Sequence, residues 1–351
     1  MALQLIKPDT RIPFIAFRKP AFILSALVIL LGVVSIAMKG GVRYGIDFAG
    51  GTIVQVQFAK SVELDDLKDT LAETGLSGLV VQRFGMAEDN EYLIRISALD
   101  VAAGEVRQKV EQALEAGMPD SGYVIQRQEM VGPKVGADLR TKAMEAMFYA
   151  VLLIAIYISG RFEQRWMAAG LMAAGLSGGI YLLGLVSVPI GWLVWAAMAI
   201  TLILCRYLKL NYALGAVVAL IHDVLVTVTV FSLLNKEFDL SIVAALLTII
   251  GYSLNDTIIV FDRIRENIKA KISKSFAETI DVSINQTLSR TLLTSGTTLI
   301  VVLSLFIFGG GVIHDFAFAL LVGVIVGTYS SIFVASPILI GFRPKMEPKS
   351  E

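Results

Sequence analysis

A carboxylate within an apolar stretch is the residue in this chain best suited to chemistry. The stretch 239–267 is long enough to cross a bilayer, yet it carries Tyr252, Ser253, Asn255 and Asp256. A charged side chain inside a membrane span costs a few kcal/mol on insertion scales, so by default it marks an ion or proton site. On a helix, Tyr252 and Ser253 can line a polar stripe with Asp256. The alternative is a carboxylate that is paired for structural reasons or reaches the membrane surface.

Arg290 is the predicted cation for this carboxylate. It opens the next apolar helix, and Arg290 and Asp256 enter the membrane from the same side on consecutive helices, so they can meet. Arginine stays charged. A cation favours the charged carboxylate and burial favours the neutral one, so a site that alternates between them would load and release a proton. The alternative is a static ion pair that pins two helices. The helix of Arg290 also bears a series of hydroxyl residues: Thr291, Thr294, Ser295, Thr297 and Thr298.

Asp223 is a second acid in an apolar stretch, with His222 beside it. Adjacent residues point about 100° apart on a helix, so the two cannot both face one partner. Asp223 is either a second relay group or a structural hydrogen-bond partner between helices. We interpret His222 as a packing residue. The predicted ion pathway contains Asp256, Arg290, Asn255, Asp223, Ser253, Thr294 and Thr298.

The composition indicates a helical membrane protein. Of the 351 residues, 56% are hydrophobic and 17% are charged, and the mean hydropathy is +0.72. The net charge is zero, which gives no indication of nucleic-acid binding. Cys205 is the only cysteine, so no intrachain disulfide and no metal site is expected. The sequence has no Ser/His/Asp set, HExxH motif or ATP-binding motif, so we expect neither an enzyme nor a cofactor.

The apolar runs predict eight transmembrane helices. We favour an uncleaved first span over a signal peptide, because the run is long and no A-x-A site precedes Lys39. Basic clusters then fall on one side, which the positive-inside rule makes cytoplasmic. The predicted segments are a basic arm (1–19), spans at 20–38 and 136–161, an extra hairpin of two spans (166–186 and 188–205), four further spans (210–234, 239–262, 289–309 and 313–342), a basic amphipathic cytoplasmic segment (263–288) and a tail (343–351).

Residues 39–135 are predicted to form one small α+β domain on the opposite, periplasmic side. The patterns read as a strand at 52–58, a helix at 62–73, strands at 79–84 and 91–97, a helix at 103–116 and a strand at 123–130. The order β-α-β-β-α-β is that of the ferredoxin-like fold. Glycine-rich turns mark both junctions of this domain with the membrane part and predict a hinge: Gly45, Asp47, Gly50, Gly51, Gly132, Pro133 and Gly136.

Several motifs together resemble the SecF family of the resistance-nodulation-division superfamily. They are Gly45-Ile46-Asp47-Phe48 with Gly50-Gly51, Val131-Gly132-Pro133 with Val135-Gly136, Leu220 to Val224, Ile250 to Thr257, Phe261 to Asn267, and Ser289-Arg290-Thr291 to Thr298. Family members usually have six spans, so the hairpin is a departure. Ala49 also stands where the family usually has threonine.

The resemblance implies a bacterial inner-membrane protein that works with SecD and the SecYEG channel, and with the accessory proteins YajC and YidC. Such complexes use the proton gradient, or sodium in some bacteria, to complete export of unfolded preproteins. The positions matching Asp256 and Arg290 belong to the family's ion pathway, and a separate SecD is expected to supply the other half. The alternatives are a small-molecule or lipid exporter of the same superfamily and a structural scaffold of the translocon.

Overall fold

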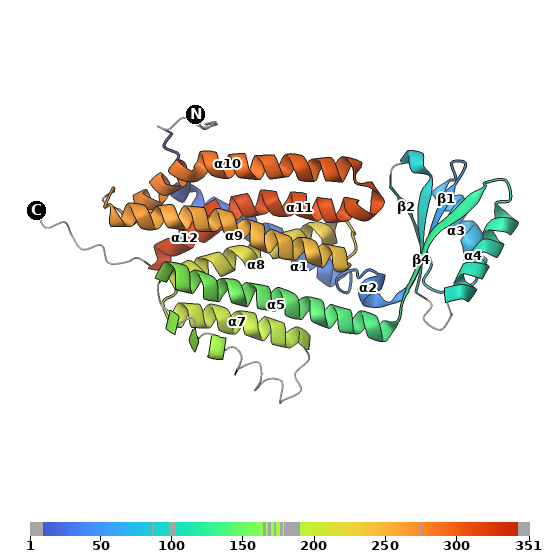
Figure 1. The fold of residues 1–351 in the computed structure, drawn as a ribbon, viewed down its shortest axis with the longest axis horizontal. Coiled ribbons are helices and arrows are strands. Elements are labelled where there is room, and N and C mark those ends of the chain that lie inside the picture. Colours follow the sequence, from blue (N-terminus) through green and yellow to red (C-terminus); the bar gives the residue numbers. More distant parts are fainter. Residues whose placement is uncertain are drawn as a thin grey trace, which may run out of the picture.

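The computed structural model describes residues 10–85, 87–97, 103–163, 166–167, 170–171, 173–175, 178, 190–273 and 275–342. They form a bundle of long helices with a small α+β domain at one end (Figure 1). Six helices in the described residues are long and apolar enough to cross a membrane. This agrees with a polytopic membrane protein, because isolated helices satisfy their own backbone hydrogen bonds in lipid.

Helices α5, α9 and α10 are longer than the spans predicted for them. Their backbone stays helical beyond the apolar residues, where the hydropathy falls. The helices of the bundle are η1 (Phe14–Phe17), α1 (Arg18–Met38), α5 (Pro133–Glu163), α7 (Ile190–Tyr207), α8 (Asn211–Leu233), α9 (Leu240–Lys269), α10 (Phe276–Phe308), α11 (Gly310–Ser330), a π-helix η3 (Ser331–Ala335), α12 (Ser336–Ile338) and η4 (Leu339–Phe342).

The segment 263–288 differs from its prediction as one basic amphipathic stretch between two spans. Helix α9 continues through Lys269, and α10 begins at Phe276, so both helices reach into it. The side chain of Ser275 caps α10 by accepting a hydrogen bond from Glu278 N at 3.1 Å, which sets the start of this helix.

The extra hairpin is described only in part. Its second half is helix α7, which packs beside α5 and α8. Residues 179–189 and five of the residues 166–178 lie outside the described residues, so the eight-span count stays a prediction.

The small α+β domain outside the bundle, called the external domain below, has the predicted element order. It contains α2 (Ile46–Ala49), β1 (Gly51–Phe58), α3 (Leu64–Ala72), β2 (Val80–Phe84), η2 (Ala87–Asp89), β3 (Glu91–Ile96), α4 (Ala103–Gly117) and β4 (Tyr123–Val131). The sheet is antiparallel with strand order β2-β3-β1-β4. Alternate residues of β1 and β3, such as Val54 and Ile94, form one core with Leu67 of α3 and Val110 of α4. Helices α3 and α4 lie on the side of the sheet away from the bundle (Figure 1).

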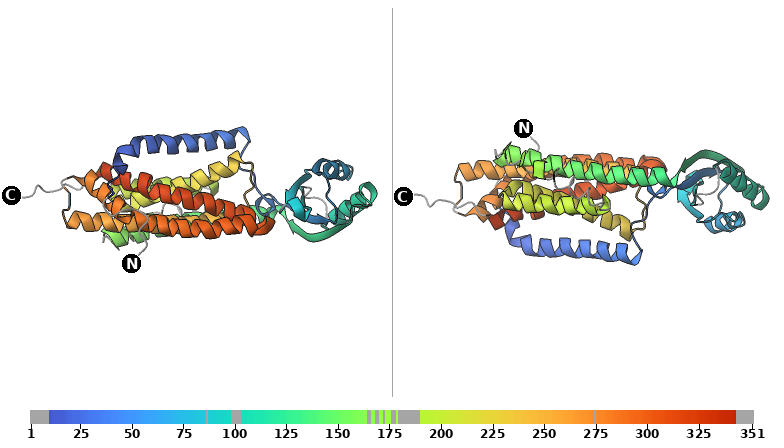
Figure 2. Two further views of the ribbon diagram at one scale, coloured as in Figure 1. Left: turned by 90° about the horizontal axis from the view of Figure 1, so that it is seen from above. Right: turned by 90° about the horizontal axis from the view of Figure 1, so that it is seen from below.

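The start of α1 and the end of η4 lie at the opposite end of the bundle from this domain (Figure 1). At that end the N-terminal segment meets α10, where Ile15 N donates to Asp281 Oδ1 at 2.9 Å. Arg161 Nη2 meets Asp262 Oδ2 at 2.7 Å, which joins the ends of α5 and α9. Helix α1 runs along one flank of the bundle, as Figure 2 shows, and packs against α8.

Small residues let α9 and α11 approach closely. A Cβ on Gly323 would lie 2.2 Å from Ile249 Cγ1, and one on Gly327 would lie 2.9 Å from Ser253 Cβ. Glycines at such crossings are typical of close helix packing in membranes. The π-helix follows directly after this contact, and π-turns inside helices are frequent at functional sites.

Candidate functional site

Asp256 lies buried where α9 meets α10 and α11. The residue is only 1% exposed, and its Oδ2 accepts a hydrogen bond from Ser295 Oγ at 3.2 Å. Ser295 Oγ in turn accepts from Thr328 Oγ1 at 2.7 Å. The carboxylate is therefore connected to α10 and, through Ser295, to α11.

The other carboxylate oxygen has no such partner. Asp256 Oδ1 is buried without a hydrogen bond among the described residues, and the same holds for Tyr252 Oη, Thr257 Oγ1 and Thr291 Oγ1. Tyr252 and Asp256 share a face of α9, as Thr291 and Ser295 share a face of α10, because residues four apart on a helix are neighbours. Buried polar atoms nearly always have partners, so a group of orphaned ones on facing helices is suited to receive a proton, an ion or water.

Arg290 does not form the predicted contact. Its side chain is exposed, and no ion pair joins it to Asp256 in the part of the chain that the structure describes. The hydroxyls of Thr294 and Thr298 bond back to Arg290 O and Thr294 O, at 2.9 and 3.0 Å, instead of pointing at Asp256. A hydroxyl in a helix readily bonds to the carbonyl four residues earlier, which spacing alone does not reveal.

Asp223 occupies a second buried cluster. It is fully buried, and its Oδ2 accepts hydrogen bonds from Ser253 Oγ at 2.5 Å and Ser330 Oγ at 2.8 Å. Ser253 was predicted to line a stripe with Asp256, but it faces Asp223 on α8. Asp223 thereby links α8 to α9 and α11.

His222 also belongs to this cluster, and it is buried with a hydrogen-bond partner at both ring nitrogens, as expected of a satisfied packing residue. Its Nδ1 lies 2.9 Å from Asp223 Oδ1, although the two residues are adjacent, and its Nε2 lies 2.9 Å from Ser25 Oγ on α1. Ser25 Oγ lies 3.2 Å from Tyr329 Oη, which donates to Ala21 O at 2.9 Å. The hydrogen-bonded chain therefore runs from Asp223 across to α1.

Asn255 stands apart from both clusters. Its side chain is exposed on α9 and makes no hydrogen bond within the described residues. It therefore faces away from Asp256 and Asp223.

The junction residues bring the external domain to the start of α9. Asp47 Oδ2 accepts a hydrogen bond from Leu240 N at 3.0 Å, and Gly45 N donates to Phe238 O at 2.7 Å. Gly50 and Gly51 have φ of +78° and +129°, where other residues are strained. A Cβ on Gly136 would lie 3.0 Å from Phe48 O, so α2 sits close against α5. Gly132 and Pro133 lead from β4 into α5, and no atom lies within 4 Å of a Cβ placed on Gly132.

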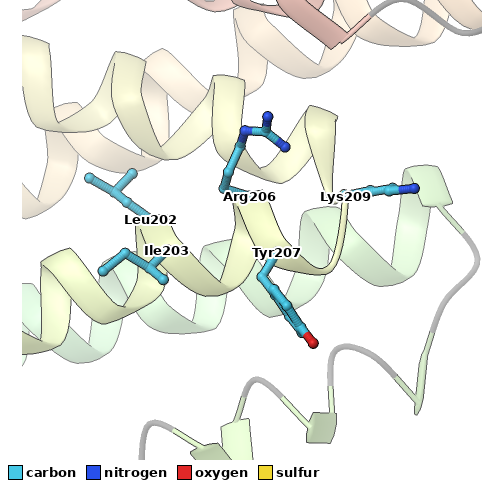
Figure 3. A pocket seen from close by; sticks show the side chains of 5 residues that line it. All are labelled: Leu202, Ile203, Arg206, Tyr207 and Lys209. Carbon is cyan, nitrogen blue, oxygen red and sulfur yellow. The ribbon is translucent and has the colours of Figure 1, made fainter.

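A surface pocket at the C-terminal end of α7 lies away from these clusters. It has a volume of about 520 Å³ on α7 and is lined by Leu202, Ile203, Arg206, Tyr207 and Lys209 (Figure 3). The side chains of Arg206 and Tyr207 point in opposite directions in this view, so they do not converge on one ligand. The cavity is therefore not the site.

Sequence reasoning missed several members of the clusters. Ser295 was noted among the hydroxyl residues of its helix but was not placed in the ion pathway. The polar run Thr328-Tyr329-Ser330 next to Gly327 in the last span was the signal that could have pointed to α11. The missed residues are Ser25, His222, Ser295, Thr328, Tyr329 and Ser330.

Comparisons with known proteins agree with this architecture. The model of the C-terminal region of the SecD/SecF protein export membrane proteins matches residues 110–190 and 185–345, and the SecD/SecF GG motif matches residues 34–62. Gly45, Gly50 and Gly51 of the junction therefore lie within a recognised motif.

Relatives match along nearly the whole chain. The protein translocase subunit SecF of Desulfurispirillum indicum is 41% identical over 344 residues, which cover 96% of this chain and 94% of that protein. The SecF subunit of Magnetococcus marinus is 42% identical over 345 residues, covering 97% and 95%.

Solved structures of SecDF have the same arrangement. The crystal structure of SecDF from Thermus thermophilus, described as a translocon-associated membrane protein, superposes with a TM-score of 0.70 at 30% identity. The match covers 96% of this chain and 39% of the SecDF chain. A SecDF structure in a super-membrane-facing form gives a TM-score of 0.56 at 31% identity and covers 97% of this chain and 39% of that one. With identity above 40% to complete relatives, a matching membrane region and a matching junction motif, the chain belongs to the SecF family of protein translocase subunits.

Proposed function

We propose that the chain couples the movement of protons, or of sodium, to preprotein export through a SecYEG channel, as one half of a complex with SecD. The observation that carries the proposal is Asp256, a buried carboxylate with one oxygen bonded to Ser295 and the other without a partner among the described residues. An acid in that position is poised to exchange a cation. The accessory proteins YajC and YidC are the further partners that we propose.

The coupling step is a change of charge on Asp256. When the carboxylate takes up a proton, it loses its negative charge and becomes a hydrogen-bond donor as well as an acceptor. Ser295 and Thr328 connect this change to α10 and α11. The packing of α9 against these helices then differs between the two charge states.

The free energy that the ion gradient supplies is small, but it is sufficient to bias a conformational equilibrium. One charge that crosses 100 mV supplies about 2.3 kcal/mol. That corresponds to roughly a fiftyfold change in a conformational equilibrium. Such a bias is enough to make backward sliding of an exported chain unfavourable, and it requires neither covalent chemistry nor a cofactor.

In this proposal the protein lies in the bacterial inner membrane, with both termini cytoplasmic and the external domain periplasmic. We infer that this domain is ferredoxin-like. Its element order and strand order, together with two helices on one face of the sheet, support this inference.

The test uses the full chain and its SecD in vesicles with SecYEG and a preprotein. We expect Asp256→Asn to remove the export that depends on an imposed gradient, because the amide cannot exchange a cation. The matched control is Asp262→Asn, on the same helix, whose carboxylate is half-exposed and pairs with Arg161. Separate proton and sodium gradients identify the ion. Gradient-dependent export by Asp256→Asn at the wild-type rate would remove this residue from the mechanism, and solute efflux without an effect on export would favour an exporter.

A further inference from the structure

The loop between α8 and α9 contacts three parts of the protein at the outer end of the bundle. Lys236 Nζ lies 2.5 Å from Asp315 Oδ1 on α11, and Phe238 N donates to Arg43 O at 2.8 Å. Asp239 Oδ1 accepts from Ile242 N at 2.9 Å and so caps α9, the helix of Asp256. The loop is therefore connected directly to the first turn of α9.

Glu237, in the same loop, contacts the external domain. Both terminal nitrogens of Arg95 donate to the two carboxylate oxygens of Glu237, a bidentate ion pair. Arg43 Nε lies 3.2 Å from Glu237 Oε1. Among the described residues, Arg95–Glu237 is the only side-chain ion pair between residues 51–131 and the bundle.

The location of Arg95 explains how it reaches the bundle. It lies on β3 between Ile94 and Ile96, whose side chains are buried in the domain core. Since successive side chains of a strand point to opposite faces, Arg95 is on the face without helices. That face is turned toward the bundle (Figure 1).

The electrostatic attraction between Arg95 and Glu237 is opposed by the cost of burying both charges. Arg95 and Glu237 are only 13% and 14% exposed. Burial, with a smaller contribution from the Arg43 cation, lowers the pKa of Arg95 to about 10. Arg95 Nε is also buried without a partner among the described residues. A buried pair of this kind contributes little net stability, but removal of one partner leaves a buried charge that must return to water.

The backbone next to the pair is built to bend. Gly50 and Gly51 join α2 to β1, and Gly132 and Pro133 join β4 to α5. Residues 51–131 are thus joined to the rest of the protein by two glycine-containing connections and, among the described residues, by one side-chain ion pair to the bundle.

We propose that Arg95 and Glu237 form a releasable latch, which holds the external domain against the start of α9 and must open for the domain to move. The latch passes a displacement of α9 to the domain through Glu237, two residues before the cap Asp239. The purpose of the latch rests on the proposed function, whereas its existence does not.

The first experiment measures docking directly. In a Cys205→Ser background, spin labels are placed at Gln108→Cys on α4 and Lys142→Cys on α5, both exposed. Pulsed electron paramagnetic resonance then gives the distance distribution in the full chain with SecD in lipid. We expect Arg95→Gln and Glu237→Gln each to lower the ratio of docked to undocked molecules roughly tenfold, as for loss of one charged hydrogen-bonded contact.

The matched control is Arg127→Gln, which removes an exposed arginine paired with Glu129 on β4 and leaves the latch intact. It should leave the distribution unchanged. The double variant Arg95→Gln/Glu237→Gln should be no worse than either single one, because the two residues act through one contact. An unchanged distribution in the single variants, or additive effects in the double, would overturn the latch.

The second experiment closes the latch. Arg95→Cys and Glu237→Cys, also without Cys205, are joined by a short reducible thiol cross-linker, and export is compared before linking, after linking and after reduction. We expect gradient-dependent export to be lost on linking and to return on reduction. Full export in the linked state, while Asp256→Asn remains inactive, would overturn the need for opening and leave the proposed function intact. If Asp256→Asn exports normally, the proposed function fails, and the distance measurement still decides whether Glu237 holds the domain.

Discussion

Ser253 and Asp256 lie one turn apart on α9, yet their side chains belong to two different buried clusters. Ser253 Oγ donates to Asp223 on α8, whereas Asp256 accepts a hydrogen bond from Ser295 on α10. Helix α11 contributes to both clusters as well, through Ser330 and Thr328. A shift of α9 along α11 therefore changes the surroundings of both carboxylates together.

Ser295→Ala removes the described hydrogen bond of Asp256. We expect gradient-dependent export to fall by about tenfold, because a hydrogen bond to a charged group contributes about 1.5–3 kcal/mol. The effect should be smaller than that of Asp256→Asn, which removes the charge itself. The control is Thr297→Ala, two residues away, whose exposed hydroxyl bonds to Leu293 O. Equal export by the Ser295 and Thr297 variants would mean that this hydrogen bond has no part in coupling.

Substitutions of Asp223 distinguish a relay from a structural group. Asp223→Ala removes the carboxylate partner of His222 and Ser253, whereas Ser330 Oγ keeps Gly327 O as an acceptor at 3.2 Å. We therefore expect a loss of about 1–3 kcal/mol for each unsatisfied group that stays buried. Thermal unfolding in detergent should show a clear decrease. Asp223→Asn retains an acceptor oxygen and the size of the side chain, and should unfold closer to wild type.

Export by Asp223→Asn then decides between the two roles. A variant that folds and assembles with SecD but lacks gradient-dependent export identifies Asp223 as a relay group. Wild-type export by the same variant identifies Asp223 as a structural hydrogen-bond partner.

Gly327→Ala tests the close contact of α9 and α11. The added methyl group would lie 2.9 Å from Ser253 Cβ and 3.3 Å from Ser253 Cα, so the helices must separate. Overpacking of this kind costs about 1–3 kcal/mol. The expected result is a lower unfolding temperature of the purified chain.

Gly251→Ala is the matched control on α9, because no atom lies within 4 Å of a Cβ at that position. It should leave the unfolding temperature equal or raise it, since alanine reduces the conformational entropy of the unfolded chain by about 0.4–1 kcal/mol. A stabilising Gly327→Ala would contradict the described packing.

Gly51→Ala tests the junction of the external domain. Gly51 has φ of +129°, and a Cβ there would lie 2.7 Å from Ile96 O in the neighbouring strand. Backbone strain of this type costs about 1–3 kcal/mol. We expect faster hydrogen exchange of the β1 and β3 amides, measured on the full chain. Gly104→Ala is the control, because no atom lies within 4 Å of a Cβ at this position near the start of α4. It should leave these amides as protected as in wild type.

The sequence alone determined the class of the protein and the order of its parts. The hydropathy pattern located the six long apolar helices of the bundle. A membrane span needs a long apolar run, whichever helices pack beside it. Apolar residues repeat with a period of two in the strands of the external domain and with the helical period in its helices. These patterns located both kinds of element, because the core needs one apolar face on each. The acids Asp223 and Asp256 stood out for the same reason, since charged groups are rare in apolar spans.

The tertiary structure alone decided which groups meet. Helical periodicity tells which residues share a face, but it does not fix the rotation and height of one helix against the next. Those depend on packing, as at Gly327 against Ser253, which turns Ser253 toward Asp223. The same reason explains why Arg290 remains exposed, why His222 reaches Ser25 on α1, and why Arg95 finds Glu237, 142 residues away in the chain. No local pattern encodes a contact between residues so far apart, because only the folded arrangement brings them together.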